Sequence, residues 1–161
     1  KSDIVHALHK EGFALLRTLF SSLELVEHPF ERLKATGRTY LRFAKDYPDF
    51  YEVMFIMKEP MDYLESENGE EDVCWEEGKQ VFGLLIQTVL DCQAAGYFPN
   101  TDPNHVALQA WSTVHGLCSL YITTHLQKVG EDKLSESNAD VLVEGTFTTY
   151  INLMEQTKLN K

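Results

Sequence analysis

The chain has 161 residues, of which 43% are hydrophobic and 24% are charged. This length and composition are typical of a globular protein with a substantial core and exclude wholesale disorder. The formal net charge of −11 is unsuited to the phosphate backbone of a nucleic acid, which binds clustered Lys and Arg. The three cysteines are far apart in the sequence, which argues against a disulfide framework and for a reducing compartment. With no signal peptide expected and no apolar run near ~18 residues, we expect a cytoplasmic protein without membrane association.

Helical periodicity begins with the first residues of the chain. Apolar residues recur at three- and four-residue steps, which predicts a helix over about residues 1–25, with Ser2 as its cap. The chain therefore starts within a helical pattern and lacks an initiator Met, which suggests that an upstream segment is missing.

A second helix is expected over residues 29–47, because the pair His-Pro marks a break before it. Gly37 lies in the middle of this helix, where it costs about 1 kcal/mol relative to Ala. We therefore expect a close neighbour or a bulky side chain at Gly37. Pro48 ends the helix, and a short third helix over 48–57 is unusually rich in aromatic residues and Met.

Residues 58–72 are rich in carboxylates and also contain Pro60 and Gly69. This composition predicts a mobile, solvated loop. A long helix is expected next, over 72–95, and Gly96 ends it.

The following helix, over 102–127, organises the chain. Asp102 is its expected N-cap, Pro103 suits its first position, and Gly130 suits the left-handed residue that follows a helix. Its apolar residues cover roughly half of its circumference, well beyond the ~100° stripe of a surface helix. We therefore expect this helix to be central, packed against its own domain on one side and against a second copy on the other.

A last helix is expected over 137–157, where Ser137 and Asp140 resemble a capping box. No segment alternates with period two for long enough to form a strand. The predicted fold is all-α, with about six helices.

Three patches of the sequence resemble one family. The opening KSDIV (residues 1–5) resembles the start of the helix that follows the DNA-binding helix-turn-helix of TetR-type repressors. The run PFERLKATGRTYLRFAKDYPDFYEVMF is similar to one branch of that family, in which a Phe-Ala pair (Phe43 and Ala44) ends a helix and a Pro (Pro48) breaks it. Residues 111–116, WSTVHG, match the tryptophan, histidine and glycine signature of the WHG-type C-terminal domain.

This resemblance implies that residues 1–161 form an effector-binding and dimerisation domain, in which 1–26 form the helix connecting to an absent DNA-binding domain. It implies a cytoplasmic transcriptional regulator, usually a repressor and a homodimer, whose last two helices pack against their symmetry mates as a four-helix bundle. A small hydrophobic or amphipathic effector would occupy a pocket between the middle helices and release DNA. DNA binding would require the missing N-terminal domain, and no cofactor is expected.

The candidate pocket is a set of aromatic, Met and His side chains on several predicted helices. Its members are Tyr40, Phe43, Phe50, Met54, Phe55, Phe82, Trp111 and His115. In the functional interpretation His115 is a polar anchor, Trp111 is a flat apolar wall, and Met adapts to irregular ligands. In the alternative interpretation the same residues are ordinary core packing, with His115 bonded to a backbone carbonyl.

The candidate dimer interface lies on the outer faces of the last two helices. Its members are Thr113, Gly116, Leu117 and Leu120 on the first helix and Leu142, Thr146, Tyr150 and Leu153 on the second.

Catalytic and metal sites are not expected. The six His and three Cys lack CxxC or HExxH spacing, so no structural metal is predicted. Ser119 and His115 are four residues apart on one helix, but no orienting acid accompanies them, and no phosphate loop or nucleophile elbow is present.

The alternative function, from another class, is a free-standing helical adaptor that binds a partner protein and no small molecule.

Overall fold

The computed structural model describes residues 2–58, 76–134 and 136–159. Within these ranges every regular element is helical, so the predicted all-α fold is confirmed. The long helices are α1 (Ser2–Ser21), α2 (Pro29–Asp46), α5 (Glu76–Ala94), α6 (Pro103–Ile122) and α8 (Ala139–Glu155). The short elements are the 3₁₀ turn η1 (Ser22–Leu25), α3 (Pro48–Tyr51), the π-helical turn η2 (Glu52–Ile56), α7 (His125–Val129) and the π-helical turn η3 (Gly130–Leu134). No helix of this described part is long and apolar enough to cross a membrane.

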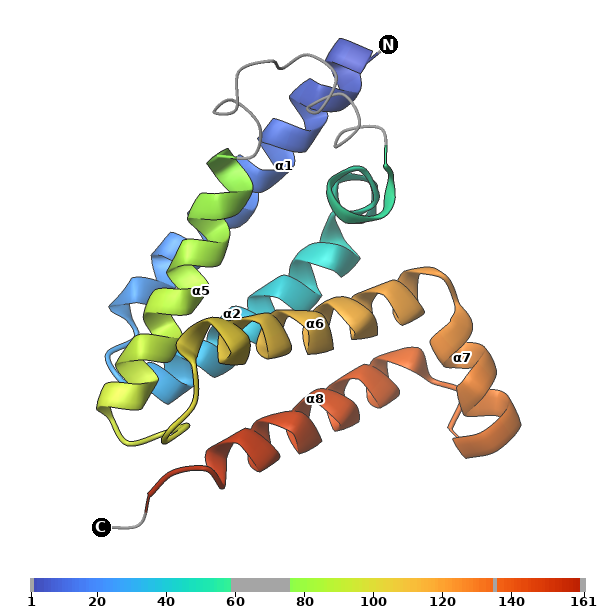
Figure 1. The fold of residues 1–161 in the computed structure, drawn as a ribbon. Coiled ribbons are helices and arrows are strands. Elements are labelled where there is room, and N and C mark those ends of the chain that lie inside the picture. Colours follow the sequence, from blue (N-terminus) through green and yellow to red (C-terminus); the bar gives the residue numbers. More distant parts are fainter. Residues whose placement is uncertain (1, 59–75, 135, 160–161) are drawn as a thin grey trace.

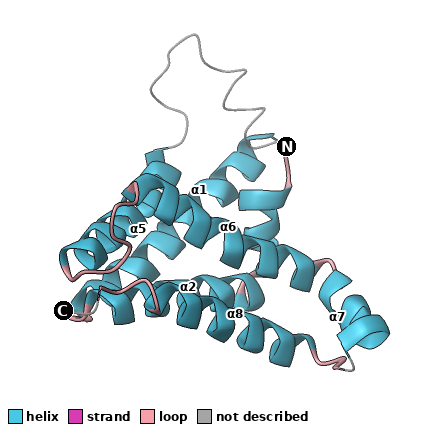
Figure 2. Ribbon diagram, turned by 60° about the horizontal axis from the view of Figure 1, so that its bottom comes forward, coloured by secondary structure: helices cyan, strands magenta, loops and turns pink. Residues whose placement is uncertain are grey.

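Helices α1 and α5 lie side by side, and α2 packs against both α5 and α6 (Figures 1 and 2). Helix α8 runs along α6 at the C-terminal side of the molecule, and α7 lies beyond the ends of these two helices (Figure 1). The core lies where α1, α2, α5, α6 and α8 meet. The predicted loop over 58–72 lies, apart from Lys58, outside the described residues, as do Cys74 and the expected first turn of the long helix that follows.

The starts of α2 and α6 follow from their sequences. Each helix has Pro in its first position, where the missing N–H costs no hydrogen bond. The ring of His28 accepts a hydrogen bond from the backbone N–H of Glu31 at 3.3 Å. The carboxylate of Asp102 accepts from the backbone N–H of Asn104 at 2.8 Å, which confirms the predicted N-cap of α6.

Gly37 admits a bulky neighbour, as predicted. A Cβ atom at Gly37 would lie 2.7 Å from the ring of Phe147, closer than a side chain tolerates. Gly37 therefore lets Phe147 of α8 pack directly on the backbone of α2, where that ring is fully buried.

The end of α6 differs from the prediction. The helix stops at Ile122 instead of near residue 127, because Thr124 adopts the left-handed conformation with φ 59°. Gly130, predicted to be the left-handed residue, has a right-handed φ of −59°. Glycine serves a steric need there, because a Cβ atom would clash with the backbone carbonyl oxygen of Glu136 where the chain approaches α8.

The cap of α8 also differs from the prediction. Asn138, and not Ser137, precedes the helix, and its side-chain oxygen accepts from the backbone N–H groups of Asp140 and Val141 at 2.9 and 3.3 Å. Asn is at least as good an N-cap as Ser, so the shift by one residue needs no compensation.

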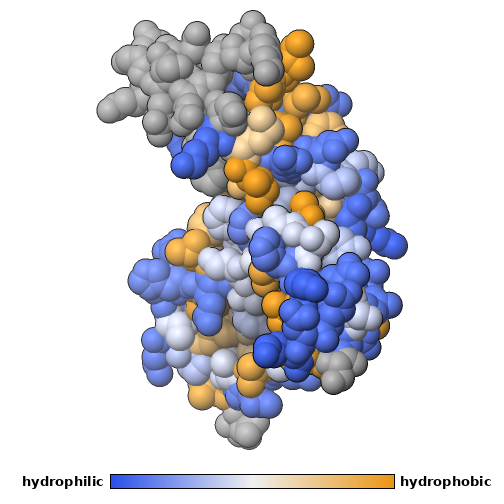
Figure 3. All heavy atoms as spheres, turned by 90° about the vertical axis from the view of Figure 1, so that its right-hand side faces the viewer, coloured by the Kyte–Doolittle hydropathy of each residue, from blue (hydrophilic) through white to orange (hydrophobic). Residues whose placement is uncertain are grey.

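The surface seen from the right-hand side of Figure 1 is mostly hydrophilic, with separate hydrophobic patches (Figure 3). Hydrophobic residues gather most visibly near the end of the molecule where α1 begins (Figure 3). Exposed apolar side chains of that end include Ile4 and Leu8 of α1 and Ile56 of η2.

Candidate ligand-binding cavity

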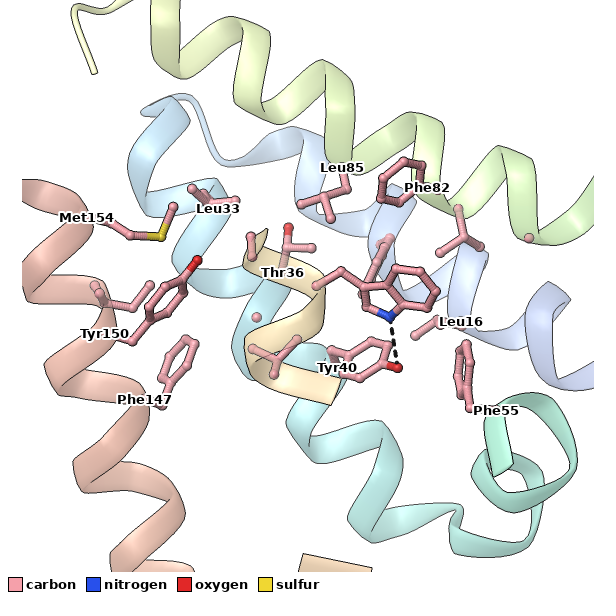
Figure 4. A pocket seen from close by; sticks show the side chains of 18 of the residues that line it. Leu16, Leu33, Thr36, Tyr40, Phe55, Phe82, Leu85, Phe147, Tyr150 and Met154 are labelled. Carbon is pink, nitrogen blue, oxygen red and sulfur yellow. Dashed lines mark hydrogen bonds between the residues drawn. The ribbon is translucent and has the colours of Figure 1, made fainter. Parts of the chain in front are cut away.

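A cavity of about 50 Å³ lies between the long helices and η2 (Figure 4). Its walls are Phe13, Leu16 and Phe20 of α1; Leu33, Thr36, Gly37 and Tyr40 of α2; Phe55 of η2; Gly78, Val81, Phe82 and Leu85 of α5; Ala110, Trp111 and Val114 of α6; and Phe147, Tyr150, Ile151 and Met154 of α8. None of these lining residues is charged. An ionic group placed among them would lose its hydration without gaining a partner, which is costly. The cavity is therefore chemically suited to a neutral, mainly apolar molecule.

Four of the eight predicted pocket residues line this cavity. They come from α2, η2, α5 and α6, and they are Tyr40, Phe55, Phe82 and Trp111. Their rings contact one another: Phe55 and Trp111 have centroids 6.2 Å apart, and Phe82 and Trp111 have centroids 5.8 Å apart. The structure thus brings together aromatic residues that are up to 71 positions apart in the sequence.

The other four predicted pocket residues lie outside the cavity wall. Phe43 is buried in the core, and its ring contacts that of Tyr47 with centroids 5.5 Å apart. Phe50 is half-buried on α3. Met54 is buried against Gly12 of α1. His115 is absent from the cavity wall and lies 3.1 Å, at its Nδ1, from the Tyr40 hydroxyl.

His115 belongs to a hydrogen-bonded cluster that joins three helices. The indole N–H of Trp111 donates to the hydroxyl of Tyr40 at 3.1 Å. The hydroxyls of Tyr40 and Tyr51 lie 3.1 and 2.7 Å from His115 Nδ1, and the Tyr51 hydroxyl is also 3.3 Å from the carbonyl oxygen of His115. A neutral His115 has one lone pair at Nδ1, which accepts from the Tyr40 hydroxyl, while the Tyr51 hydroxyl can donate to the carbonyl oxygen of His115. This polar cluster (Tyr40, Tyr51, Trp111 and His115) fixes α2, α3 and α6 to one another.

The polar cluster is uncharged near neutral pH. Burial lowers the pKa of His115, because the imidazolium form would lose its hydration. Burial is also the main reason that the pKa values of Tyr40 and Tyr51 are raised. The polar cluster therefore places hydrogen-bonding groups next to the cavity without placing a charge there.

The π-helical turn η2 connects the cavity with α1. Phe55 of η2 lines the cavity, and its ring stacks edge-on against Phe13 with centroids 5.3 Å apart. The preceding residue, Met54, packs onto Gly12 of α1, where a Cβ atom would displace the Met sulfur from its present position. Adjacent residues of η2 therefore contact the cavity and the backbone of α1, at the kind of irregular turn that is frequent at functional sites.

Sequence reasoning did not identify the contributions of α1 and α8 to the cavity. Phe20, Phe147 and Met154 belong to the apolar faces of their helices, and periodicity alone does not distinguish a cavity wall from a filled core. Tyr150 was assigned to the dimer interface from its position on α8. The structure places it half-buried at the cavity wall.

The remaining candidate interface residues differ in their exposure. Leu120, Thr146 and Leu153 are exposed on α6 and α8, with Leu153 59% exposed. Thr113, Gly116 and Leu142 are half-buried. Leu117 is buried within the protomer, where it contributes to the core.

No group of three or more His, Cys, Asp or Glu side chains that could hold a metal ion occurs in residues 2–58, 76–134 or 136–159. Cys92 and Cys118 are free and buried, and burial raises the pKa of both thiols to about 12. Neither thiol is therefore poised as a nucleophile.

The described residues thus form an all-helical fold that encloses a cavity lined by uncharged side chains. Residues 33–144 match the family described as "Tetracyclin repressor-like, C-terminal domain". The chain belongs to this family, and the resemblance seen in the sequence is confirmed.

A solved structure supports the fold independently. It is described as "Structure of a protein with unknown function from Rhodococcus sp. RHA1", and it aligns with a TM-score of 0.68 and 22% sequence identity. The alignment covers 93% of this chain and 72% of that chain. At this identity the likeness concerns the fold alone. No functionally curated protein matches the chain.

Proposed function

We propose that this chain is the effector-binding and dimerisation domain of a TetR-type transcriptional regulator, acting as a repressor in the cytoplasm. The effector is a small, neutral, mainly hydrophobic molecule. The observation that carries the proposal is the cavity itself, whose lining residues come from five long helices and η2 and include no charged side chain. DNA binding would belong to a domain preceding residue 1, and residues 1–26 would connect the two.

The small volume of the cavity supports a role in switching. An engineered cavity of about 150 Å³ in another protein admits benzene, whereas this cavity measures about 50 Å³. A ring-sized effector must therefore displace walls of the cavity, and Phe55, Phe82, Trp111 and Tyr150 are the lining aromatic residues that are only half-buried. A ligand that binds only the expanded state shifts the population toward that state.

The contacts of η2 supply a route from the cavity to α1. Displacement of Phe55 moves η2, and the contact between Met54 and Gly12 transmits that movement to the backbone of α1. In the proposed regulator α1 connects to the DNA-binding domain, so expansion of the cavity reorients that domain.

Enzymatic activity is not part of this proposal. The tetracycline repressor-like family is generally non-enzymatic. His115, four residues before Ser119, uses its Nδ1 for the tyrosine hydroxyls of the polar cluster, and no carboxylate in the described ranges is hydrogen-bonded to it.

The ligand proposal is tested by a thermal-melt screen of neutral hydrophobic molecules, with cationic and acidic molecules of similar size as comparisons. A ligand at 100 times its Kd adds about 2.7 kcal/mol, which raises Tm by about 5–10 °C for a domain of this size. Phe82→Ala, at the cavity wall, should reduce the shift. Phe50→Ala, which removes a half-buried Phe outside the cavity, should not. If charged molecules raised Tm as much as neutral ones, or if Phe82→Ala and Phe50→Ala reduced the Tm shift equally, the cavity would not be the binding site.

Dimerisation through α6 and α8 is supported by their exposed apolar residues. Leu120 is 44% and Leu153 59% exposed. A Cβ at Gly116 of α6 or Gly145 of α8 would meet no atom of the described residues within 4 Å. These helices therefore present accessible, partly apolar faces, which suits a helix-to-helix contact.

Sedimentation velocity at tens of micromolar tests the dimer. We expect a dimer for the wild-type chain and a weaker dimer for Leu120→Glu and Leu153→Glu. Leu25→Glu is the matched control, since Leu25 in η1 is 87% exposed and lies on neither helix. A monomeric wild type, or equal dissociation of all three variants, would favour the alternative function of a helical adaptor that binds another protein.

A further inference from the structure

The hydroxyl of Tyr150 is buried and makes no hydrogen bond to any described residue. Its ring lines the cavity from α8, and its oxygen points toward the side chains of Leu33 and Thr36 of α2 (Figure 4). Burial raises the pKa of Tyr150 to about 12, so the group is a neutral phenol at physiological pH.

The other polar side chains that line the cavity are satisfied. The hydroxyl of Thr36 donates to the carbonyl oxygen of Arg32 at 2.9 Å, and Tyr40 and Trp111 bond to each other in the polar cluster. Of the four polar side chains at the wall, Tyr150 is thus the one that lacks a partner within the described part of the chain.

One hydroxyl of α6 lies near that of Tyr150 without forming a hydrogen bond to it. Thr113 of α6 neighbours the Tyr150 hydroxyl and slightly opposes the effect of burial on its pKa. The hydroxyl of Thr113 donates to the carbonyl oxygen of Gln109 at 2.9 Å and keeps lone pairs that could accept a hydrogen bond. However, no hydrogen bond of acceptable geometry joins it to the Tyr150 hydroxyl. The Tyr150 proton therefore remains available.

A buried hydroxyl without a partner is unfavourable, because the group has lost its hydrogen bonds to water. An acceptor atom on a bound ligand would remove this penalty and gain a hydrogen bond in an apolar environment. A ligand of the same shape without an acceptor would leave the penalty in place. The hydroxyl therefore discriminates between ligands that the apolar walls alone do not distinguish.

We propose that Tyr150 determines effector specificity, and that the effector is a neutral apolar molecule carrying a carbonyl or ether oxygen that accepts a hydrogen bond from the Tyr150 hydroxyl. This assignment rests on the proposed function, since it requires that the cavity bind a small molecule. It adds the chemical class of the effector and the atom that recognises it.

The test compares two probes of nearly equal shape, acetophenone and α-methylstyrene, which differ in a carbonyl oxygen against a methylene group. Their dissociation constants are measured by isothermal titration calorimetry with the wild-type chain and with Tyr150→Phe. Tyr47→Phe is the matched control, since Tyr47 is exposed and lies outside the cavity wall.

We expect Tyr150→Phe to raise the dissociation constant of acetophenone by about fivefold to tenfold, which corresponds to the loss of one neutral hydrogen bond. The same substitution should change the dissociation constant of α-methylstyrene by less than about a factor of two. Tyr47→Phe should change neither dissociation constant. Equal changes for the two probes would overturn the role of the hydroxyl while leaving the cavity as a binding site. Failure of both probes to bind the wild-type chain would overturn the assignment together with the proposed function.

The stability of the unliganded variant supplies a second, independent readout. Removing a hydroxyl that lacks a partner should leave Tm unchanged or raise it by about 2–4 °C. A fall in Tm of that size would mean that the hydroxyl already has a partner, such as a buried water, and would overturn the proposal without reference to any ligand.

Discussion

Tyr40 and Tyr150 both line the cavity, on α2 and on α8, but their hydroxyls have opposite environments. The hydroxyl of Tyr40 accepts from Trp111 and lies 3.1 Å from His115 Nδ1, whereas that of Tyr150 makes no hydrogen bond within the described residues. Both are buried and neutral, so the difference lies in their neighbours and not in their chemistry. A satisfied buried network stabilises one arrangement of helices, whereas an unsatisfied group at a cavity wall leaves a hydrogen bond available to a ligand.

The largest expected effect comes from removing the centre of the polar cluster. His115→Leu should lower the free energy of unfolding by about 2–3 kcal/mol, because the hydroxyls of Tyr40 and Tyr51 lose their contacts with His115 Nδ1. Urea denaturation measures this loss, with His105→Gln as the control at an exposed position of the same helix. If the two variants were equally stable, the cluster would not be what holds α2, α3 and α6 together.

A smaller effect, but a more direct comparison, comes from making the same change at the two tyrosines. Tyr40→Phe should destabilise the chain by about 1–2 kcal/mol, because the indole N–H of Trp111 loses its acceptor. Tyr150→Phe should be neutral or stabilising. The urea midpoint should therefore fall in Tyr40→Phe and stay unchanged or rise in Tyr150→Phe. A fall of the same size in both variants would contradict the difference between the two hydroxyls.

The smallest expected effect is a pH dependence of stability that originates in the polar cluster around Tyr40, where His115 titrates. Burial lowers the pKa of His115 in the folded chain, so below the ordinary value of about 6.5 the unfolded chain binds protons more readily than the folded chain. The stabilising contribution of neutral His115 is complete above that pH and is lost as the pH falls below it. His9, whose pKa is also lowered chiefly by burial, contributes in the same direction.

Urea titrations between pH 8 and pH 5 should therefore show a nearly constant free energy above pH 7 and a decline below about pH 6.5. The decline should be shallower in His115→Leu than in the wild-type chain, since that variant lacks one of the two groups. The slope of Tyr150→Phe should match the wild type, because a phenol does not titrate in this range. A rise in stability on acidification would contradict the neutral, accepting state of His115.

The positions where local chemistry decides the structure were predicted well. The capping residue Asp102 and the close packing at Gly37 follow from short-range rules and are confirmed. The errors are at helix ends, where competing local signals are similar in strength. Gly130 was expected to be left-handed, but Thr124 takes that conformation, and Gly130 instead allows the close approach of the chain to Glu136.

The cavity was predicted only in part, for a different reason. Aromatic spacing identified Tyr40, Phe55, Phe82 and Trp111, which line it. The same pattern also selected Phe43, which lies in the filled core. A helical periodicity shows which face of a helix is buried, and it carries no information about whether the space in front of that face is filled.

The sequence by itself therefore determined the helical class of this protein, most helix starts and the family, because these depend on periodicity, capping residues and short motifs. Only the tertiary structure decided which buried polar groups have partners. His115 obtains its hydrogen bonds from residues 64 and 75 positions away, and Tyr150 obtains none within the described chain. Such pairings depend on how α2, α3, α6 and α8 meet in space, and no local pattern encodes that meeting.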